Sequence, residues 1–170
     1  NLRATVYAWD MMNLITLGMD PISGISQYQQ ASHKVLARGT ELSLDKTWEW
    51  GARLRSSFGI QSAEQQGSSL QNSPQYLGKL NLSIPIPLMT GLRAGYELQY
   101  YGKRKTLDGT HTDNYFLSNL NVVTDVRWVK GLEASLSFYN LFNEHYQQPT
   151  DANWQSSLLQ PGRPIRLRMD

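Results

Sequence analysis

The sequence has 170 residues, a formal net charge of +2 and no cysteine, and 18% of its residues are charged. The small net charge argues against a nucleic-acid partner, and the absence of cysteine excludes disulfides and thiolate metal sites. No run of 18 apolar residues occurs, so no transmembrane helix is predicted. Low charge combined with 11% aromatic residues is typical of a transmembrane β-barrel, which has an apolar outer face and a polar lumen.

Alternation of apolar and polar residues with a period of two predicts eight strands and no amphipathic helix. In chain order they cover residues 2–9, 35–44, 52–60, 76–86, 92–102, 116–128, 132–138 and 165–169. Most contain about ten residues, close to the roughly 9 to 11 that a tilted strand needs to cross a bilayer. Globular strands are shorter, at about five to six residues. The predicted fold class is therefore all-β, an antiparallel transmembrane β-barrel.

The connections between these strands alternate between short and long. Tight turns are predicted at 45–51, 85–91 and 128–131, and long polar loops at 18–30, 62–74, 103–114 and 144–163. Outer-membrane barrels have short periplasmic turns and long extracellular loops. The pattern therefore predicts an outer-membrane protein of a Gram-negative bacterium, with the C-terminus on the periplasmic side.

Aromatic residues are predicted to form two girdles at the membrane interfaces. Trp48, Trp50 and Trp128 lie at short turns, and Tyr76, Tyr100, Tyr115 and Tyr139 lie toward the opposite strand ends. The alternative is that these rings pack in a core. On the predicted outward face, Arg38 is the one charged residue.

The predicted inward face carries a ladder of charges of both signs. Its members are Arg53, Arg55, Lys79, Arg93, Glu97, Asp125, Arg127, Glu133, Arg166 and Arg168. The mixture predicts ion pairs within the lumen, or contacts with a plug, rather than a catalytic site. The alternative is that some of these side chains line a path for a substrate.

The stretch SFYNLFNEHYQQP at 137–149, followed by QPGRPIRLRM at 160–169, resembles the C-terminal end of TonB-dependent outer-membrane receptors. The matching residues are Asn140, Leu141, Phe142, Asn143, Tyr146, Pro161, Gly162 and Arg163. The stretches at 7–17 and 38–44 also resemble earlier strands of that family, so the resemblance covers nearly the whole chain. At a barrel rim, water and loop backbone can satisfy the polar groups of the two asparagines.

The resemblance implies a 22-stranded barrel whose lumen is filled by an N-terminal plug that contacts TonB. Residues 1–170 then form a C-terminal portion of the barrel, a fragment without the plug. Residue Asn1 falls in mid-pattern with no signal peptide, and the family commonly ends on an aromatic residue, whereas this chain ends at Asp170. We therefore expect a natural start upstream and a few further residues downstream.

The implied function is active, TonB-dependent uptake of a scarce ligand, such as an iron-siderophore, a cobalamin-like cofactor or a glycan. The implied partners are outer-membrane lipid, the TonB complex through the plug, the remainder of the barrel and a small ligand such as a metal chelate. The expected ligand contacts are loop-tip residues: Tyr28, Gln29, His111, Asp113, Trp154 and Gln155. The alternative is that the loop aromatics only cap the rim.

No catalytic or cofactor motif is found in the sequence. His33, His111 and His145 lack metal-ligand spacing, and no phosphate-binding glycine motif occurs. We therefore predict no enzymatic activity, no cofactor and no metal site. Two other readings stay open: a self-contained eight-stranded outer-membrane barrel with a structural or adhesive role, and a soluble β-barrel that binds a small ligand inside.

Overall fold

The computed structural model describes residues 1–20, 22–30, 33–88, 91–125, 132–150 and 155–169. All the regular elements in these ranges are β-strands. Within the same ranges there is no helix long and apolar enough to cross a membrane. The predicted all-β class is confirmed.

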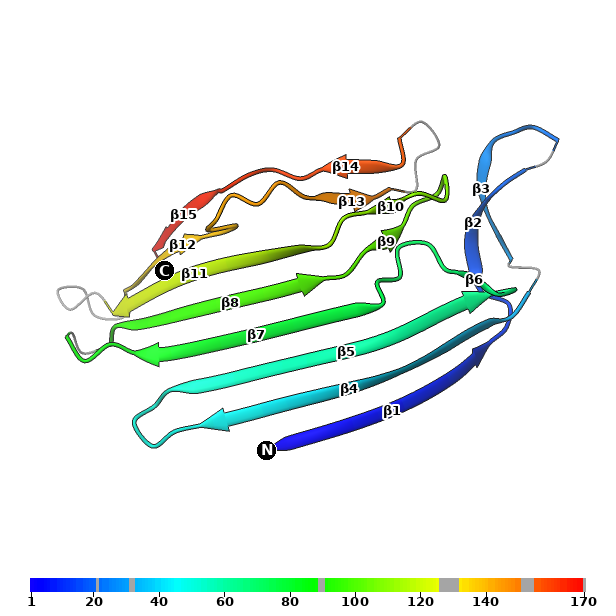
Figure 1. The fold of residues 1–170 in the computed structure, drawn as a ribbon. Helices are drawn as coiled ribbons and strands as arrows, with labels where there is room; N and C mark the ends of the chain where they lie inside the picture. Colours follow the sequence, from blue (N-terminus) through cyan, green and yellow to red (C-terminus); the bar gives the residue numbers. More distant parts are fainter. Residues whose placement is uncertain (21, 31–32, 89–90, 126–131, 151–154, 170) are drawn as a thin grey trace.

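The main sheet is an antiparallel meander in which each long strand pairs with the next long strand along the chain (Figure 1). In order, its strands are β1 (Leu2–Met11), β4 (Val35–Thr47), β5 (Arg53–Gln65), β7 (Tyr76–Pro85), β8 (Arg93–Tyr101), β11 (Tyr115–Asp125), β12 (Glu133–Phe138) and β15 (Ile165–Met169). All eight predicted strands are found, although residues 126–128 of the sixth lie outside the described residues. Strands β1 and β15 are the two edges of the sheet, so the barrel is not closed.

The long connections contain short strands that the sequence pattern did not predict. They form three hairpins, β2 (Ile15–Met19) with β3 (Ser26–Gln30), β9 (Arg104–Lys105) with β10 (His111–Thr112), and β13 (Gln147–Pro149) with β14 (Ser157–Leu159), while β6 (Ser68–Ser69) pairs with β5. Because consecutive long strands are antiparallel, all long connections leave the sheet at one end, on the right of Figure 1. We call this the loop end, and the opposite end the turn end.

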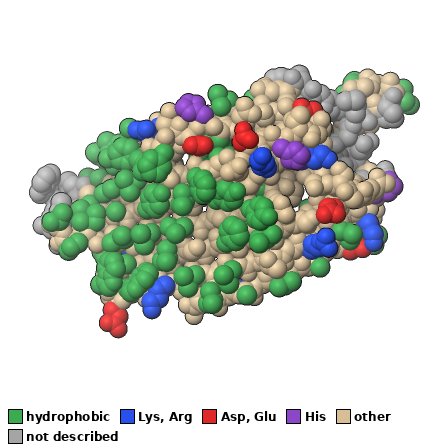
Figure 2. All heavy atoms as spheres, in the orientation of Figure 1, with side chains coloured by type: hydrophobic (Ala, Val, Ile, Leu, Met, Phe, Trp, Pro, Cys, Tyr) green, Lys and Arg blue, Asp and Glu red, His purple; other side chains and the backbone are tan. Residues whose placement is uncertain are grey.

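Cross-strand register keeps apolar residues on one face of the sheet and polar residues on the other. Leu82 lies between Leu54 and Tyr96, whereas its neighbour Asn81 lies between Arg55 and Glu97. Figure 2 shows hydrophobic side chains gathered over the strands on one face. Many are exposed, including Val6 at 79% and Leu167 at 66%. So large an exposed apolar surface is expected where a sheet meets lipid, not water.

The apolar face carries charge only near its two ends among the described residues. Asp10, Arg38 and Glu64 lie on it at the loop end, and Lys46 lies on it at the turn end. The prediction of Arg38 as the single outward charge was wrong, because β1, β4 and β5 run further than the alternation indicated. Charge costs little near a membrane interface, so these positions agree with a lipid-facing surface.

The predicted aromatic girdle is partly corrected. Tyr76 and Tyr100 lie on the apolar face, where their rings are 6.4 Å from Phe58 and 4.7 Å from Phe116. Tyr115 and Tyr139 lie on the polar face, since each is one residue away from an outward phenylalanine. At the turn end, the Trp48 and Trp50 rings are 6.3 Å apart. Trp128 lies outside the described residues.

Candidate functional site

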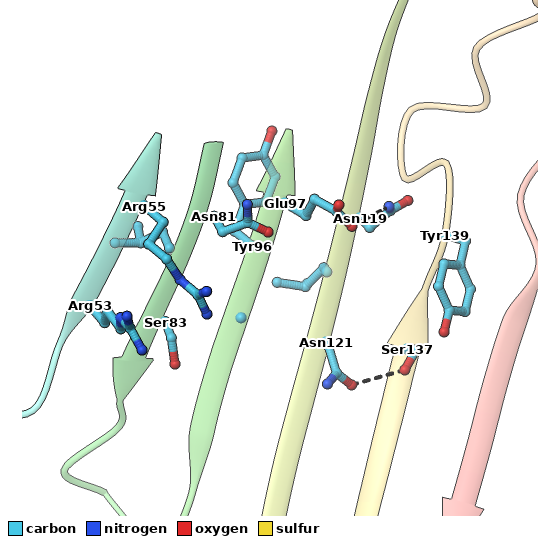
Figure 3. A pocket seen from close by; sticks show the side chains of 13 residues that line it. Arg53, Arg55, Asn81, Ser83, Tyr96, Glu97, Asn119, Asn121, Ser137 and Tyr139 are labelled. Carbon is cyan, nitrogen blue, oxygen red and sulfur yellow. Dashed lines mark hydrogen bonds between the residues drawn. The ribbon is translucent and has the colours of Figure 1, made fainter. Parts of the chain in front are cut away.

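A groove of about 380 Å³ crosses the polar face over five neighbouring strands, β5, β7, β8, β11 and β12 (Figure 3). Its polar lining residues are Arg53, Arg55, Asn81, Ser83, Glu97, Asn119, Asn121, Ser137 and Tyr139. Two cross-strand hydrogen bonds order its floor. The Asn119 amide donates to Glu97 at 2.9 Å, and the Ser137 hydroxyl donates to Asn121 at 2.9 Å.

The charges on this face are only partly paired with one another. The Arg53 guanidinium lies 2.7 Å from the carboxylate of Asp45, a residue outside the predicted ladder. Arg93 instead donates to the Gly51 carbonyl and to a serine hydroxyl. Arg55 lies directly opposite the same Asp45 on the neighbouring strand. In the described part of the chain, no ion pair or hydrogen bond ties the side chain of Lys79. Lys79 therefore leaves the face able to attract an anionic group.

A second groove, of about 460 Å³, lies at the loop end between the β2–β3 hairpin, β6 and β9. Tyr28 lines it, together with Gln71, Asn72 and Lys105. Tyr28 is 75% exposed on β3, so its ring is free to contact a ligand. Gln29 follows it on the same strand, with its backbone paired to Thr16.

The remaining expected ligand contacts belong to the two other hairpins. His111 begins β10, Asp113 follows that strand, and both are exposed. Gln155 lies in the β13–β14 connection, and its carbonyl accepts a hydrogen bond from the Thr150 hydroxyl. Trp154 lies outside the described residues. The expected contacts therefore fall at two places along the loop end, not at one.

The turn of the β9–β10 hairpin is organised by Asp108. Its carboxylate accepts hydrogen bonds from the Thr106 hydroxyl at 2.5 Å and from the Thr110 hydroxyl and backbone. These donors, Thr106 first, lower the pKa of Asp108 to about 2. Ser156 of the β13–β14 connection adds to this lowering of the pKa, and β10 contacts β13, so the two hairpins lie against each other.

The motif at 140–146 is a turn beyond β12 rather than a longer strand. Asn140 has a positive φ of 47°, and its side chain bonds the Glu144 backbone in both directions, at 2.9 and 2.8 Å. The Asn143 side chain accepts from the Arg163 backbone at 3.2 Å, and a Cβ on Gly162 would lie 2.5 Å from that same oxygen. The expectation that loop backbone satisfies these asparagines is confirmed. The motif fastens the chain before β15 to the end of β12.

We expect Asn140→Ala to destabilise the folded protein by about 1 kcal/mol, because it leaves the part-buried backbone groups of Glu144 without their partner. Asn140 is only 6% exposed. The measurement is the urea midpoint of the assembled receptor. Glu144→Ala is the control, since Glu144 contributes its backbone to the turn and its side chain is exposed. Equal midpoints for the two variants would contradict this role for Asn140.

Sequence reasoning missed the most buried charged residue of the loop end. Arg104, part of a short basic run, is 7% exposed and lies against Tyr101 and Tyr115. The alternation around Tyr101 and Tyr115 indicates that both face inward, but nothing in the sequence shows that a loop arginine folds back over them. In the described part of the chain, no group of three or more His, Cys, Asp or Glu could hold a metal ion.

A family model described as TonB dependent receptor-like, beta-barrel, matches residues 1–141. A search of curated protein sequences found no match. The fold is similar to the closed form of the ferric-catecholate import receptor Fiu from E. coli K12, at 20% identity and a TM-score of 0.73, covering 99% of this chain and 24% of that one.

Two further solved structures are similar over 99% of this chain, each at 15% identity. One is P. aeruginosa FpvA bound to a heterologous pyoverdine, with a TM-score of 0.74 and 24% of its length covered. The other is the FrpB iron transporter from Neisseria meningitidis, with a TM-score of 0.71 and 28% covered. The chain thus spans about a quarter of the length of these structures. At such identities the likeness shows a shared fold.

Proposed function

Because this chain belongs to the TonB-dependent receptor β-barrel family, we propose that it forms part of the wall of an outer-membrane receptor that takes up a ferric siderophore. Its apolar face contacts lipid, and its polar face lines the lumen. The remainder of the barrel pairs with its edge strands, β1 and β15, and a plug domain connects the receptor to the TonB complex. The protein acts as a transporter, not as an enzyme.

The observation that carries this proposal is the two-faced sheet, whose apolar face, in the part of the chain that the structure describes, bears charge only near its ends. Such a wall separates lipid from a polar lumen. Solved structures with this fold are named for ferric-catecholate import and for binding pyoverdine, which supports an iron chelate over a cobalamin-like cofactor or a glycan. Ferric catecholates are anionic, and among the described residues Lys79 gives the polar face a positive charge that no carboxylate pairs.

The two alternative readings of the sequence lack support. A self-contained eight-stranded barrel requires β1 to pair with β15, but these strands are opposite edges of the sheet. A soluble barrel with an apolar interior requires polar residues on its outer face. Yet the groove of Figure 3 lies on the polar face and is lined by charged and amide side chains.

The test is uptake of radioactive iron by iron-starved cells that carry or lack the receptor containing this segment. Iron is supplied as a catecholate, a hydroxamate or a mixed chelate. We expect deletion of the receptor to abolish uptake of at least one chelate, and a protonophore to abolish the same uptake in the parent strain. Unchanged uptake of every chelate, together with loss of cobalamin or glycan uptake, would contradict the siderophore assignment alone. No change in any uptake would contradict the transport function.

We expect Tyr28→Ala to weaken binding of the transported chelate roughly tenfold, or about 1.4 kcal/mol, since the ring lines the loop-end groove. The measurement is an equilibrium binding titration on the purified receptor. Ile22→Ala is the matched control, because Ile22 lies on the same hairpin, is 96% exposed and does not line the groove. An equal loss of affinity in both variants would argue against a direct contact. The other proposed ligand contacts are Gln29, His111, Asp113, Trp154 and Gln155.

A further inference from the structure

Arg104 lies in one long connection at the loop end and is hydrogen-bonded to two others. Its own segment is β9, in the connection between β8 and β11. One Nη donates to the Asn72 side chain, in the connection between β5 and β7, at 3.2 Å. The other Nη donates to the Gln147 carbonyl, in the connection between β12 and β15, at 3.4 Å. A single side chain therefore joins three loops that are far apart in the sequence.

The same guanidinium rests on aromatic rings that stand on the polar face of the sheet. Tyr101 and Tyr115 are directly opposite each other on β8 and β11, with ring centroids 5.2 Å apart. The Arg104 guanidinium carbon lies 5.5 and 5.6 Å from these two ring centroids, and Nη2 donates to the Tyr115 hydroxyl at 2.9 Å. Cation–π contacts gain strength when the cation is removed from water, as it is here.

Tyr146 extends this stack into the last long connection. Its ring lies 4.4 Å from that of Tyr115, and burial, followed by the neighbouring Tyr101, raises the pKa of Tyr146. Tyr146 therefore packs its own segment onto β11 from the side of the polar face. In the described residues the Arg104 guanidinium forms no ion pair with a carboxylate, so neutral acceptors and π-faces hold it in place.

We propose that Arg104, Tyr101, Tyr115 and Tyr146 form a latch that fixes the three long connections relative to one another. Only a planar guanidinium can stack on the ring pair while its separate N–H groups reach Asn72, Tyr115 and Gln147. Arg104 is thus a positioning residue for the side of the loop-end groove formed by Asn72 and Lys105, and for the β9–β10 hairpin that presents His111. This inference rests on the proposed function in one respect: it takes these loops to be the ones that bind the ligand.

The test measures distances between loops and needs no ligand. In the receptor carrying this segment, Gln71→Cys and His145→Cys introduce spin labels in two of the connections, at exposed positions outside the latch. The segment has no cysteine of its own to interfere. Pulsed electron resonance should give one narrow distance distribution. We expect Arg104→Gln to widen it at least twofold, because the connections are then free to move separately.

Controls separate the latch from general damage to the protein. Arg166→Gln is the matched control, since Arg166 also lies over a tyrosine, Tyr139, at 5.6 Å, but is exposed and forms no hydrogen bond to a loop among the described residues. This variant should leave the distribution narrow. Arg104→Lys should not restore the narrow distribution, because an ammonium lacks the planar fork. If Arg104→Gln does not assemble, Tyr146→Leu replaces it and should also widen the distribution.

An unchanged distribution in assembled Arg104→Gln, or in Tyr146→Leu where that replaces it, would overturn the latch, and so would full restoration by Arg104→Lys. Neither result would bear on iron uptake, which tests the transport function separately. A narrow parent distribution, widened by Arg104→Gln and not by Arg166→Gln, would support the latch.

Discussion

Leu82→Arg is expected to prevent assembly of the receptor in the outer membrane, whereas Asn81→Arg is expected to be tolerated. The two residues are adjacent on β7 but point to opposite faces. An arginine at 82 would stand between Leu54 and Tyr96 on the lipid side, at a cost of about 2–4 kcal/mol near mid-bilayer. An arginine at 81 would stand in the polar groove beside Glu97, whose carboxylate can form an ion pair with it.

The measurement is the fraction of each variant that is folded in the outer membrane, read from the shift in gel mobility between unheated and heated samples. A second pair on β12 repeats the comparison away from β7. Leu136→Arg falls on the apolar face and should fail, while Ser135→Arg falls on the polar face and should assemble. Equal folded yields for all four variants would show that the assignment of faces is wrong.

The strands and their faces could be predicted because side chains alternate between the two faces of a strand. Once one face is buried in lipid, every second residue has to be apolar. A shift of one residue in register would put Asn81 into lipid and Leu82 into the lumen, so the pattern also determines the register. The prediction worked best in mid-strand, where apolar and polar residues alternate without exception, as in β7 and β12.

The predictions failed where that contrast disappears. Near the loop end, Arg38 and Glu64 lie on the same face as leucines, so the alternation stops before the strand does. Tyr115 was assigned to a girdle because it lies far along the strand from the short turn. The alternation of side chains along β11 places it on the polar face instead. The short hairpins, such as β2 with β3, lie in long polar connections where no lipid imposes an alternating pattern.

The candidate site was less predictable than the strands because its contacts join residues distant in sequence. The burial of Arg104 depends on Asn72 and Gln147, which lie 32 and 43 residues away. The positive φ of Asn140 depends on a turn that closes on Glu144. The resemblance drew attention to the 140–146 motif, but only the folded chain shows that its asparagines fasten the segment before β15 to the end of β12.

Gly39→Ala is expected to destabilise the folded receptor by about 1–3 kcal/mol, the usual cost of inserting an atom into a filled space. Gly39 lies on the polar face of β4, opposite Tyr7 of β1 and Gln61 of β5. A Cβ there would lie 2.6 Å from the Tyr7 hydroxyl and 2.7 Å from the Ile60 carbonyl oxygen. The carbonyl belongs to the backbone of the neighbouring strand, so it cannot move without disturbing the sheet.

The Tyr7 ring covers Gly39 because its hydroxyl is hydrogen-bonded to a residue of β5, the strand on the other side of β4. It donates to Gln61 at 3.1 Å, and Gln61 in turn donates to the Pro74 carbonyl at 2.9 Å. The urea midpoint of Gly39→Ala should therefore fall, and Tyr7→Ala added to it should restore only part of the loss, since the Ile60 contact remains. Gly59→Ala, on the same face with its nearest neighbour at 3.7 Å, should leave the midpoint almost unchanged. A similar fall for both glycine variants would mean that strand propensity, not the close approach of Tyr7, requires Gly39.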